Sequence, residues 1–312
     1  MPNRLALIFP GQGTQYLGMG RDLYERYPEA RVVFDETDEL LGFKLSKLCF
    51  EGPEEELHDT INTQPAILTM SLATFQALKT QHHVEGIAFA AGHSLGEYTA
   101  LVASDNISFA DAVRLVRERG RLMKKAGQEH PGGMAAVLGL EAEVVGEACR
   151  QAGEETGKVV QVANYNSPGQ TVVSGEQEAL EKAMELARYK GARRVVRLAV
   201  SIASHSRLME SAARGLRQAI EDVVFQEAKI PVVANVTAKP LRNPEEVREE
   251  LVKQLISPVR WVDSVRYMLN HGVTTFVEIG PGDVLSKLIK RIEPGVERTN
   301  VGDVAGVEIW SA

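Results

Sequence analysis

The chain alternates short apolar runs with longer stretches of amphipathic helical pattern. Short apolar runs bounded by proline or glycine indicate buried strands. Four such runs occupy the two ends of the chain: Leu5–Phe9, Gly86–Ala91, Pro231–Val236 and Thr274–Ile279. Helical patterns lie near them: Ile67–Lys79, Asp111–Ala126, Ser206–Asp222 and Val284–Arg291. Short buried strands that alternate with helices predict a mostly parallel sheet covered on both faces.

The stretch from residue 131 to 200 departs from this alternation. Its pattern predicts a strand, a helix, two strands, a second helix and a last strand: Gly133–Leu140, Glu143–Gln151, Val159–Ala163, Gln170–Ser174, Gln177–Tyr189 and Arg194–Val200. That order is the split βαβ arrangement of ferredoxin-like domains. We therefore predict an α/β protein in which residues 131–200 form a small ferredoxin-like domain between the two halves of a larger one, residues 1–130 and 201–312.

Composition narrows the class of protein. Of 312 residues, 44% are hydrophobic and 25% charged, which is ordinary for a globular protein and excludes a disordered chain. The net charge of −7 argues against a nucleic-acid binder. Cys49 and Cys149 are too few for a disulfide framework, and we expect buried thiols in a reducing compartment. No apolar run approaches the roughly 20 residues of a membrane span, so we expect a cytoplasmic protein.

A serine turn is the sharpest local signal. Residues 92–96 read G-x-S-x-G, with Ser94 at the centre. The turn follows the apolar run Gly86–Ala91 and precedes a helical pattern, Glu97–Ser104, which is the setting of a nucleophile elbow. Glycines on either side remove Cβ atoms that would clash. The positive end of the following helix favours a developing oxyanion.

A serine nucleophile needs a base, and His205 is the favoured one of seven histidines. It lies between a predicted strand and a predicted helix, where open α/β sheets build their sites. His93 adjoins the serine, but neighbours on a turn point apart, so we expect it to orient or pack. No acidic residue between Ser94 and His205 stands out as the third member of a triad.

Arg119 interrupts an apolar stripe of the helix predicted around Asp111–Ala126. It lies four residues after Leu115 and three before Leu122. A guanidinium that faces a core stays protonated and needs an anion. A structural Asp or Glu and a substrate carboxylate both satisfy that need, and the residues alone leave the two open.

The loop Pro10–Gln15 follows the first predicted strand and is rich in glycine. The glycines at positions 11, 13, 18 and 20 do not form G-x-G-x-x-G, and the chain contains no phosphate-binding P-loop motif. We therefore expect this loop to offer backbone N–H groups to an oxyanion beside the serine turn.

These motifs together resemble the malonyl-CoA:acyl carrier protein transacylases of type II fatty acid synthesis, which are related to polyketide synthase acyltransferase domains. The resemblance covers nearly the whole chain, from the loop at Phe9–Gly13 to Gly280–Gly282. The segments that carry it are Gly92–Glu97, Arg119–Gly120, Asn164–Gln170, Ser204–His205, Asn235–Thr237, Gln254 and Pro258–Trp261.

The resemblance implies an α/β-hydrolase-like catalytic domain with the ferredoxin-like domain inserted in it. It implies that Ser94 is the nucleophile and His205 its base. The backbone N–H groups of Gln12 and Leu95 would form the oxyanion hole. Arg119 would hold the free carboxylate of malonate.

The resemblance also places further residues at the site. Gln254 would lie beside the histidine, where a backbone carbonyl from this region orients the imidazole in place of an acid. Asn164 and Asn166 match a position near the site on the small domain. Together with His93, these residues complete the expected substrate-binding set.

The implied reaction is a ping-pong transfer of malonyl from malonyl-CoA to the phosphopantetheine thiol of acyl carrier protein, through a malonyl-serine. It implies no metal or redox cofactor, no nucleic acid or membrane partner, and a monomer. A trans-acting polyketide acyltransferase, a serine esterase or thioesterase on the same scaffold, and a non-catalytic binding module are the alternatives. The basic stretch Arg188–Arg197 would receive the carrier protein or the CoA phosphates, unless it is a solvated face.

Overall fold

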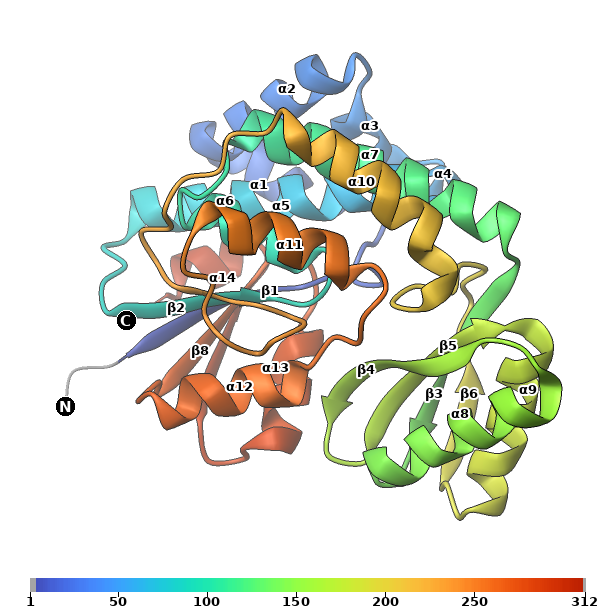
Figure 1. Cartoon of the computed structure of the whole chain (residues 1–312). Coiled ribbons are helices and arrows are strands. Elements are labelled where there is room, and N and C mark those ends of the chain that lie inside the picture. Colours follow the sequence, from blue (N-terminus) through green and yellow to red (C-terminus); the bar gives the residue numbers. More distant parts are fainter. Residues whose placement is uncertain (1–3, 311–312) are drawn as a thin grey trace.

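The computed structural model describes residues 4–310, which form two β-sheets with helices packed on them (Figure 1). The larger sheet is parallel, with strand order β7-β2-β1-β8-β9. Its strands are β1 (Leu5–Phe9), β2 (Ile87–Gly92), β7 (Val232–Val233), β8 (Thr275–Ile279) and β9 (Glu297–Val301). The smaller sheet is antiparallel, with order β4-β5-β3-β6. Its strands are β3 (Gly132–Leu138), β4 (Val160–Ser167), β5 (Gln170–Glu176) and β6 (Arg194–Arg197).

The helices fall into three groups along the chain. Those before β3 are α1 (Arg21–Arg26), α2 (Pro28–Leu41), α3 (Leu45–Glu51), α4 (Glu54–Leu57), α5 (Thr60–Gln81), α6 (Gly96–Ala103) and α7 (Phe109–Glu129). The smaller sheet carries α8 (Ala142–Thr156) and α9 (Gln177–Tyr189). A 3₁₀ turn (Arg207–Met209) then leads to α10 (Glu210–Glu221), α11 (Pro244–Gln254), α12 (Trp261–Asn270), α13 (Val284–Ile292) and α14 (Val304–Glu308).

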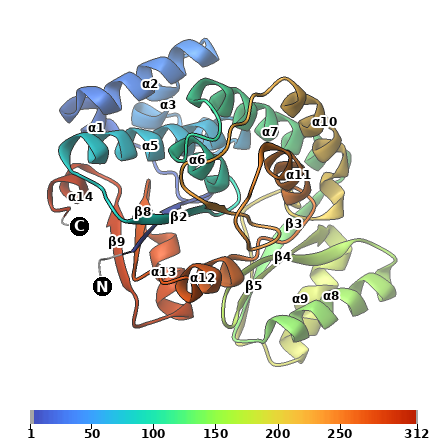
Figure 2. The same cartoon turned by 60° about the vertical axis from the view of Figure 1, so that its left-hand side comes forward.

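Helices cover both faces of the parallel sheet. Along β1, the alternate residues Leu5, Leu7 and Phe9 join the core beneath α5, whereas Ala6 and Ile8 join a second core. The second core is built with residues of α12 and α13, which lie on the opposite side of the sheet from α5 and α6 (Figures 1 and 2). The prediction of a parallel sheet with two covered faces is therefore confirmed.

The smaller sheet is joined to the larger unit by backbone contacts. Its own core lies between the sheet and helices α8 and α9. Tyr165 N–H of β4 donates to the Val259 carbonyl at 2.9 Å, and Val259 N–H donates to the Ala163 carbonyl at the same distance. Since Val259 lies two residues before α12, these bonds fix β4 against the part of the chain that covers the parallel sheet.

Several predicted boundaries are wrong for identifiable reasons. The run Pro231–Val236 yields only the two-residue edge strand β7, because Ala234 N–H turns back to the Lys239 carbonyl. The helix predicted from Ser206 begins at Glu210, since Ser206 has an extended backbone and a 3₁₀ turn follows. The strand predicted to end at Val200 ends at Arg197.

Strand β9 and several helices were not predicted. At the edge of the sheet, next to β8, β9 carries mostly polar, partly exposed residues and so has no apolar run (Figure 2). Within residues 4–310, no helix is long and apolar enough to cross a membrane. Cys49 and Cys149 are both buried, and burial raises the pKa of each thiol to about 12.

Candidate active site

Ser94 lies on a sharp turn between β2 and α6, as the motif predicts. Its φ of +52° is in the left-handed region, which is strained for a residue with a side chain. A Cβ on Gly92 would lie 1.9 Å from the Gly96 carbonyl group, and one on Gly96 would lie 2.0 Å from the Phe9 carbonyl oxygen. Only glycine fits at both positions, so the turn can close tightly and lie against the end of β1.

His205 is hydrogen-bonded to the serine. Its Nε2 lies 2.8 Å from Ser94 Oγ, and its Nδ1 donates to the backbone carbonyl of Gln254 at 2.8 Å. Because Nδ1 carries the proton, Nε2 is free to accept one from the serine hydroxyl. Burial, helped by the positive charge of Arg119, lowers the pKa of His205 to about 3. The imidazole is therefore neutral and able to act as a base.

The position of His205 differs from the one expected. Strand β6, which precedes it, belongs to the antiparallel sheet, so His205 is not at the end of a parallel strand. It lies in the segment that leads from β6 to α10, with a left-handed φ of +57°. Gln161 of β4 donates from Nε2 to the His205 carbonyl at 3.2 Å and accepts from Arg207 N–H at 3.3 Å. The smaller sheet thus helps to hold the backbone around the histidine.

The glycine loop packs directly against the serine turn. A Cβ on Gly11 would lie 2.3 Å from the His93 carbonyl oxygen, and His93 N–H donates to the Phe9 carbonyl at 3.1 Å. Ser94 N–H is already engaged by Asn235 Oδ1 at 2.7 Å. The backbone N–H groups of Gln12 and Leu95, in contrast, donate to no acceptor within residues 4–310. Both remain available to a ligand oxygen.

Arg119 is buried, with 1% of its surface exposed, and it reaches the serine. Its Nη2 donates to Ser94 Oγ at 3.1 Å and to Gln254 Oε1 at 2.9 Å, and its Nη1 donates to Gln64 Oε1 at 2.7 Å. Its Nε has no hydrogen-bond acceptor among the residues that the structure describes. No carboxylate of residues 4–310 forms an ion pair with Arg119, so the structural Asp or Glu that the sequence left open is not found there.

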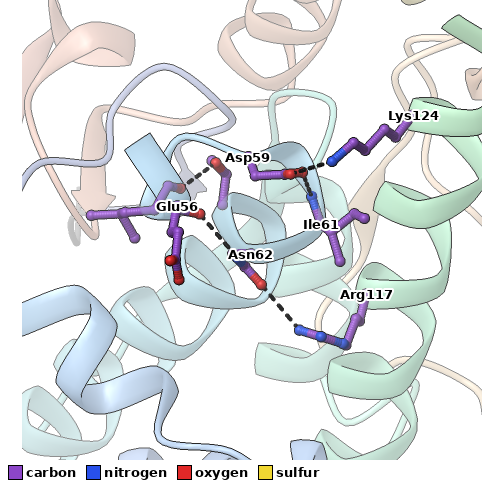
Figure 3. A network of polar contacts seen from close by, with 8 residues as sticks. Glu56, Asp59, Ile61, Asn62, Arg117 and Lys124 are labelled. Atoms are coloured by element: carbon purple, nitrogen blue, oxygen red, sulfur yellow. Dashed lines mark hydrogen bonds and ion pairs between the residues drawn. The ribbon is translucent and has the colours of Figure 1, made fainter. Parts of the chain in front are cut away.

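The close approach of α5 and α7 places Arg119. A Cβ on Gly120 would lie 2.6 Å from the Thr60 carbonyl oxygen, so only glycine lets the helices come this near. Beside this contact, Asp59 caps α5 by accepting from Ile61 N–H at 3.1 Å and pairs with Lys124 of α7 (Figure 3). One turn further along α5, Gln64 meets the guanidinium.

The other basic residues on α7 mostly have acidic partners. The ion pairs are Arg114–Asp111, Arg121–Glu118, Lys124–Asp59 and Lys125–Glu129. Arg117 instead donates to Asn62 Oδ1 at 3.2 Å (Figure 3). Four basic side chains at the surface of α7 thus have acidic partners, whereas the buried guanidinium of Arg119 forms no ion pair within residues 4–310.

The smaller sheet contributes to the site through β4. His93 Nε2 donates to Asn166 Oδ1 at 2.9 Å, and the His93 ring meets Trp261 edge-on with a centroid separation of 5.8 Å. Asn164 is buried on the same strand and forms an isolated β-bridge with Val259. His93 and Asn166 therefore connect the serine turn to β4.

Sequence reasoning assigned no role to three residues that the structure places at the site. Asn235 and Glu97 lie in segments that carried the resemblance, but their partners are remote in sequence. Gln64 lies within a mostly apolar helical run, where a lone polar residue gives a weak signal. Residues 4–310 contain no group of three or more His, Cys, Asp or Glu side chains placed to hold a metal ion.

The chain is similar to known proteins over nearly its whole length. The family described as acyl transferase domain matches residues 6–307. A Bacillus subtilis protein named malonyl CoA-acyl carrier protein transacylase is 45% identical over 309 residues, covering 98% of this chain and 96% of that protein. A structure of a type II PKS acyl-carrier protein in complex with its malonyl-transacylase matches with a TM-score of 0.95 at 42% identity, over 98% of both chains. The malonyl CoA-acyl carrier protein transacylase of Coxiella burnetii matches with a TM-score of 0.95 at 38% identity, over 99% of this chain and 96% of that one.

Proposed function

This chain belongs to the acyl transferase family, and on that basis we propose that it transfers the malonyl group of malonyl-CoA to the phosphopantetheine thiol of an acyl carrier protein. The relatives described above are named malonyl transacylases, and the match to this chain covers nearly their whole length. One of them was solved in complex with an acyl-carrier protein. The reaction proceeds by a ping-pong mechanism through a malonyl-serine.

In the loading half-reaction, Ser94 Oγ attacks the thioester carbonyl while His205 Nε2 takes its proton. The carbon–oxygen bond forms first, and the oxyanion of the tetrahedral intermediate is bound by the Gln12 and Leu95 N–H groups. The carbon–sulfur bond then breaks, and CoA leaves with the proton that His205 held. The short Ser94–His205 contact and the two unengaged N–H groups support these roles.

The unloading half-reaction runs the same steps with another thiol. The carrier thiol gives its proton to His205 and attacks the malonyl ester, and Ser94 recovers its proton as the carbon–oxygen bond breaks. Both halves balance with proton transfers alone, so the proposal includes no metal or redox cofactor.

One observation carries the choice of acyl group: Arg119 donates to the nucleophile oxygen and lacks a carboxylate partner within the described chain. An acyl group on Ser94 with a free carboxylate would meet this guanidinium, and two parallel hydrogen bonds would hold it. An acetyl group would leave the buried charge unpaired, which costs binding energy. Gln254 and Gln64 hold Arg119 in place from two sides, and the hydrogen bond between His93 and Asn166 joins the serine turn to the smaller sheet.

We also propose a finer description of the fold. The strand order of the smaller sheet, and its succession of elements, support a ferredoxin-like domain near residues 131–200. The parallel sheet with a serine elbow supports an α/β-hydrolase-like domain formed by residues 1–130 and 201–312.

A carrier protein of polyketide synthesis is a second candidate acceptor, because one solved relative acts with such a partner. A hydrolase on the same scaffold would use water as the acceptor, so carrier protein would not speed the loss of the malonyl group from Ser94.

Substitution of Arg119 tests the proposed choice of acyl group. We expect Arg119→Ala to lower the rate of malonyl loading by about 10²-fold, because the malonyl carboxylate loses a buried charged partner, while acetyl loading is kept or improved. Arg121→Ala is the matched control, since Arg121 lies on the same helix, is exposed and pairs with Glu118. Loading from malonyl-CoA and acetyl-CoA is followed by intact-protein mass spectrometry. Equal loss of both acyl groups would contradict the proposed role.

A further inference from the structure

Glu97 is a buried carboxyl group that the proposed mechanism does not use. It is the second residue of α6, three positions after Ser94, and it is fully buried. Its Oε2 accepts from Gln254 Nε2 at 3.1 Å and from Asn235 N–H at 3.0 Å. These two partners come from separate segments, and each of them contacts Ser94.

Gln254 contacts all three central residues of the site. Its Oε1 accepts from Arg119, its Nε2 donates to the Ser94 carbonyl at 3.0 Å, and its own carbonyl accepts from His205. Since a guanidinium only donates, the amide oxygen of Gln254 must face Arg119 and its NH₂ must face the other way. Glu97 Oε2 accepts from that NH₂. It therefore stabilises the one amide orientation that suits Arg119.

Asn235 fastens both sides of the serine turn. Its Oδ1 accepts from Ser94 N–H at 2.7 Å, and its Nδ2 donates to the Gly92 carbonyl at 2.7 Å. Its backbone N–H is held by Glu97. The strained backbone of Ser94 therefore depends on a residue whose own position depends on Glu97.

From these contacts we propose that Glu97 is a positioning residue for malonyl transfer, acting through Gln254 on Arg119 and through Asn235 on the serine turn. The proposal rests on the function proposed above. It adds a residue that touches no substrate and yet controls both how the malonyl carboxylate is held and how the nucleophile is presented.

The acceptor oxygen, rather than a negative charge, is what the geometry requires. Burial, reinforced by the nearby carboxyl of Glu250 on α11, raises the pKa of Glu97, while the bonds from Gln254 and Asn235 and the charge of Arg119 act in the opposite direction. A protonated carboxyl keeps one oxygen as an acceptor for both donors. An amide offers the same acceptor at the same place, so glutamine is the conservative substitute.

The test compares three variants. Glu97→Met keeps the side-chain volume but removes the acceptor, Glu97→Gln keeps the acceptor, and Glu278→Gln is the matched control. Glu278 is also a fully buried glutamate, but it accepts from Leu285 and Ser286 N–H at the start of α13 and contacts neither Gln254 nor Asn235. Folding is checked by circular dichroism and thermal unfolding before any kinetics.

We expect Glu97→Met to lower kcat/KM for malonyl-CoA by about 10²-fold, because misplaced reacting groups cost that much. Glu97→Gln should recover most of this loss, and Glu278→Gln should leave kcat/KM unchanged. Labelling of Ser94 by a fluorophosphonate, which needs no malonyl group, should slow about tenfold in Glu97→Met, because the serine turn loosens.

Wild-type rates of loading and labelling in folded Glu97→Met would overturn the proposal, as would a Glu97→Gln variant as slow as Glu97→Met. If the methionine variant does not fold, Glu97→Asp takes its place. Its carboxyl is one methylene shorter and cannot reach both donors, so we expect at least a tenfold loss, and wild-type rates would overturn the proposal. A wild-type enzyme that is labelled but takes up no malonyl contradicts the proposed function, while the labelling comparison still decides the role of Glu97.

Discussion

At the scale of single residues, His205 is held in one tautomer by its surroundings. The Gln254 carbonyl accepts from Nδ1, so Nε2 faces the Ser94 hydroxyl as an acceptor. A backbone carbonyl does here what an aspartate does in a Ser-His-Asp triad, without adding a negative charge. Because the ring is buried beside the cationic Arg119, protonation is disfavoured and its pKa falls to about 3.

This pKa predicts an unusual pH profile. For loading by malonyl-CoA, kcat/KM reports the protonation of the free enzyme, so it should show no acid limb near the ordinary histidine pKa of about 6.5. We expect it to stay flat as the pH falls from 7.5 to about 5, measured by rapid-quench loading with folding followed by circular dichroism. An acid limb centred near 6.5 in folded protein would contradict the depressed pKa.

The same shift has a consequence for stability. Between about pH 6.5 and pH 3 the unfolded chain binds a proton on His205 that the folded protein does not bind. The free energy of unfolding therefore decreases as the pH falls from about 6.5 to about 3, because the proton is bound only by the unfolded chain.

Residues that break a local pattern were predictable from the sequence. Ser94 lies between glycines after an apolar run, and Arg119 interrupts an apolar helical stripe, so each stands out in the sequence without knowledge of the fold. The prediction that His205 follows a strand of the parallel sheet is wrong, although the residue does lie beside Ser94. Asn235 and Gln64 act through partners more than 50 residues away, and no local pattern contains that information.

At the scale of elements, the pairing of α5 with α7 determines where the guanidinium lies. Asp59 serves both helices, since it caps α5 and pairs with Lys124 of α7 (Figure 3). Burial by itself would raise the pKa of Asp59, but the hydrogen bond and charge of Lys124, with the bond from Ile61 N–H, lower it below the ordinary value. The ion pair is partly exposed, so most of the stabilisation should come from the cap.

Substitution of Asp59 separates these two contributions. We expect Asp59→Ala to lower the free energy of unfolding by about 1–2 kcal/mol, because the cap and the ion pair are both lost, and Asp59→Asn to lower it by under about 1 kcal/mol, because asparagine still caps. Urea unfolding at neutral pH measures both. Since the folded pKa is lowered, the difference between wild type and Asp59→Asn should begin to shrink once the pH falls below the unfolded pKa of about 4, and it should vanish only below the still lower folded pKa. An asparagine variant as unstable as the alanine variant would show that the cap contributes little.

Buried strands were easier to predict than exposed ones. The run at β1 is apolar because both faces of that strand are covered, and its predicted bounds match the structure. The edge strand β9 faces solvent along much of its length and gave no signal, and β7 is cut short by the turn that brings Asn235 to the site. The information missing from the sequence is therefore which positions the rest of the molecule covers.

At the scale of the whole molecule, the distribution of charge says more about binding partners than the net charge of −7 does. In the stretch Arg188–Arg197, Lys190 and Arg197 pair with acidic residues, whereas Arg193 and Arg194 are exposed and form no ion pair within residues 4–310. In the antiparallel sheet, Leu138 of β3 pairs with Arg194 on one side and with Gln170 on the other. Arg194 therefore lies at the same end of the sheet as the turn between β4 and β5, which comes shortly after Asn166. We infer that this end of the sheet steers an anionic partner toward the serine.

Charge reversal tests this inference. We expect Arg193→Glu/Arg194→Glu to raise the KM for carrier protein several-fold at low ionic strength, with the rate of malonyl loading unchanged. Arg150→Glu/Arg214→Glu is the matched control, because both residues are exposed, form no ion pair within the described chain and lie on α8 and α10. An unchanged KM in the first variant, or an equal rise in both, would indicate a merely solvated face.

The central claim is that Ser94 carries a malonyl group between two thiols. The most direct test is the intact mass of the protein after mixing with malonyl-CoA and then with carrier protein. We expect a malonyl adduct in the wild type and none in Ser94→Ala, with rapid loss of the adduct to the carrier when it is added. No adduct in the wild type, or one that persists in Ser94→Ala, would contradict the claim. Loss to water at a rate that carrier protein does not change would replace the transferase with a hydrolase.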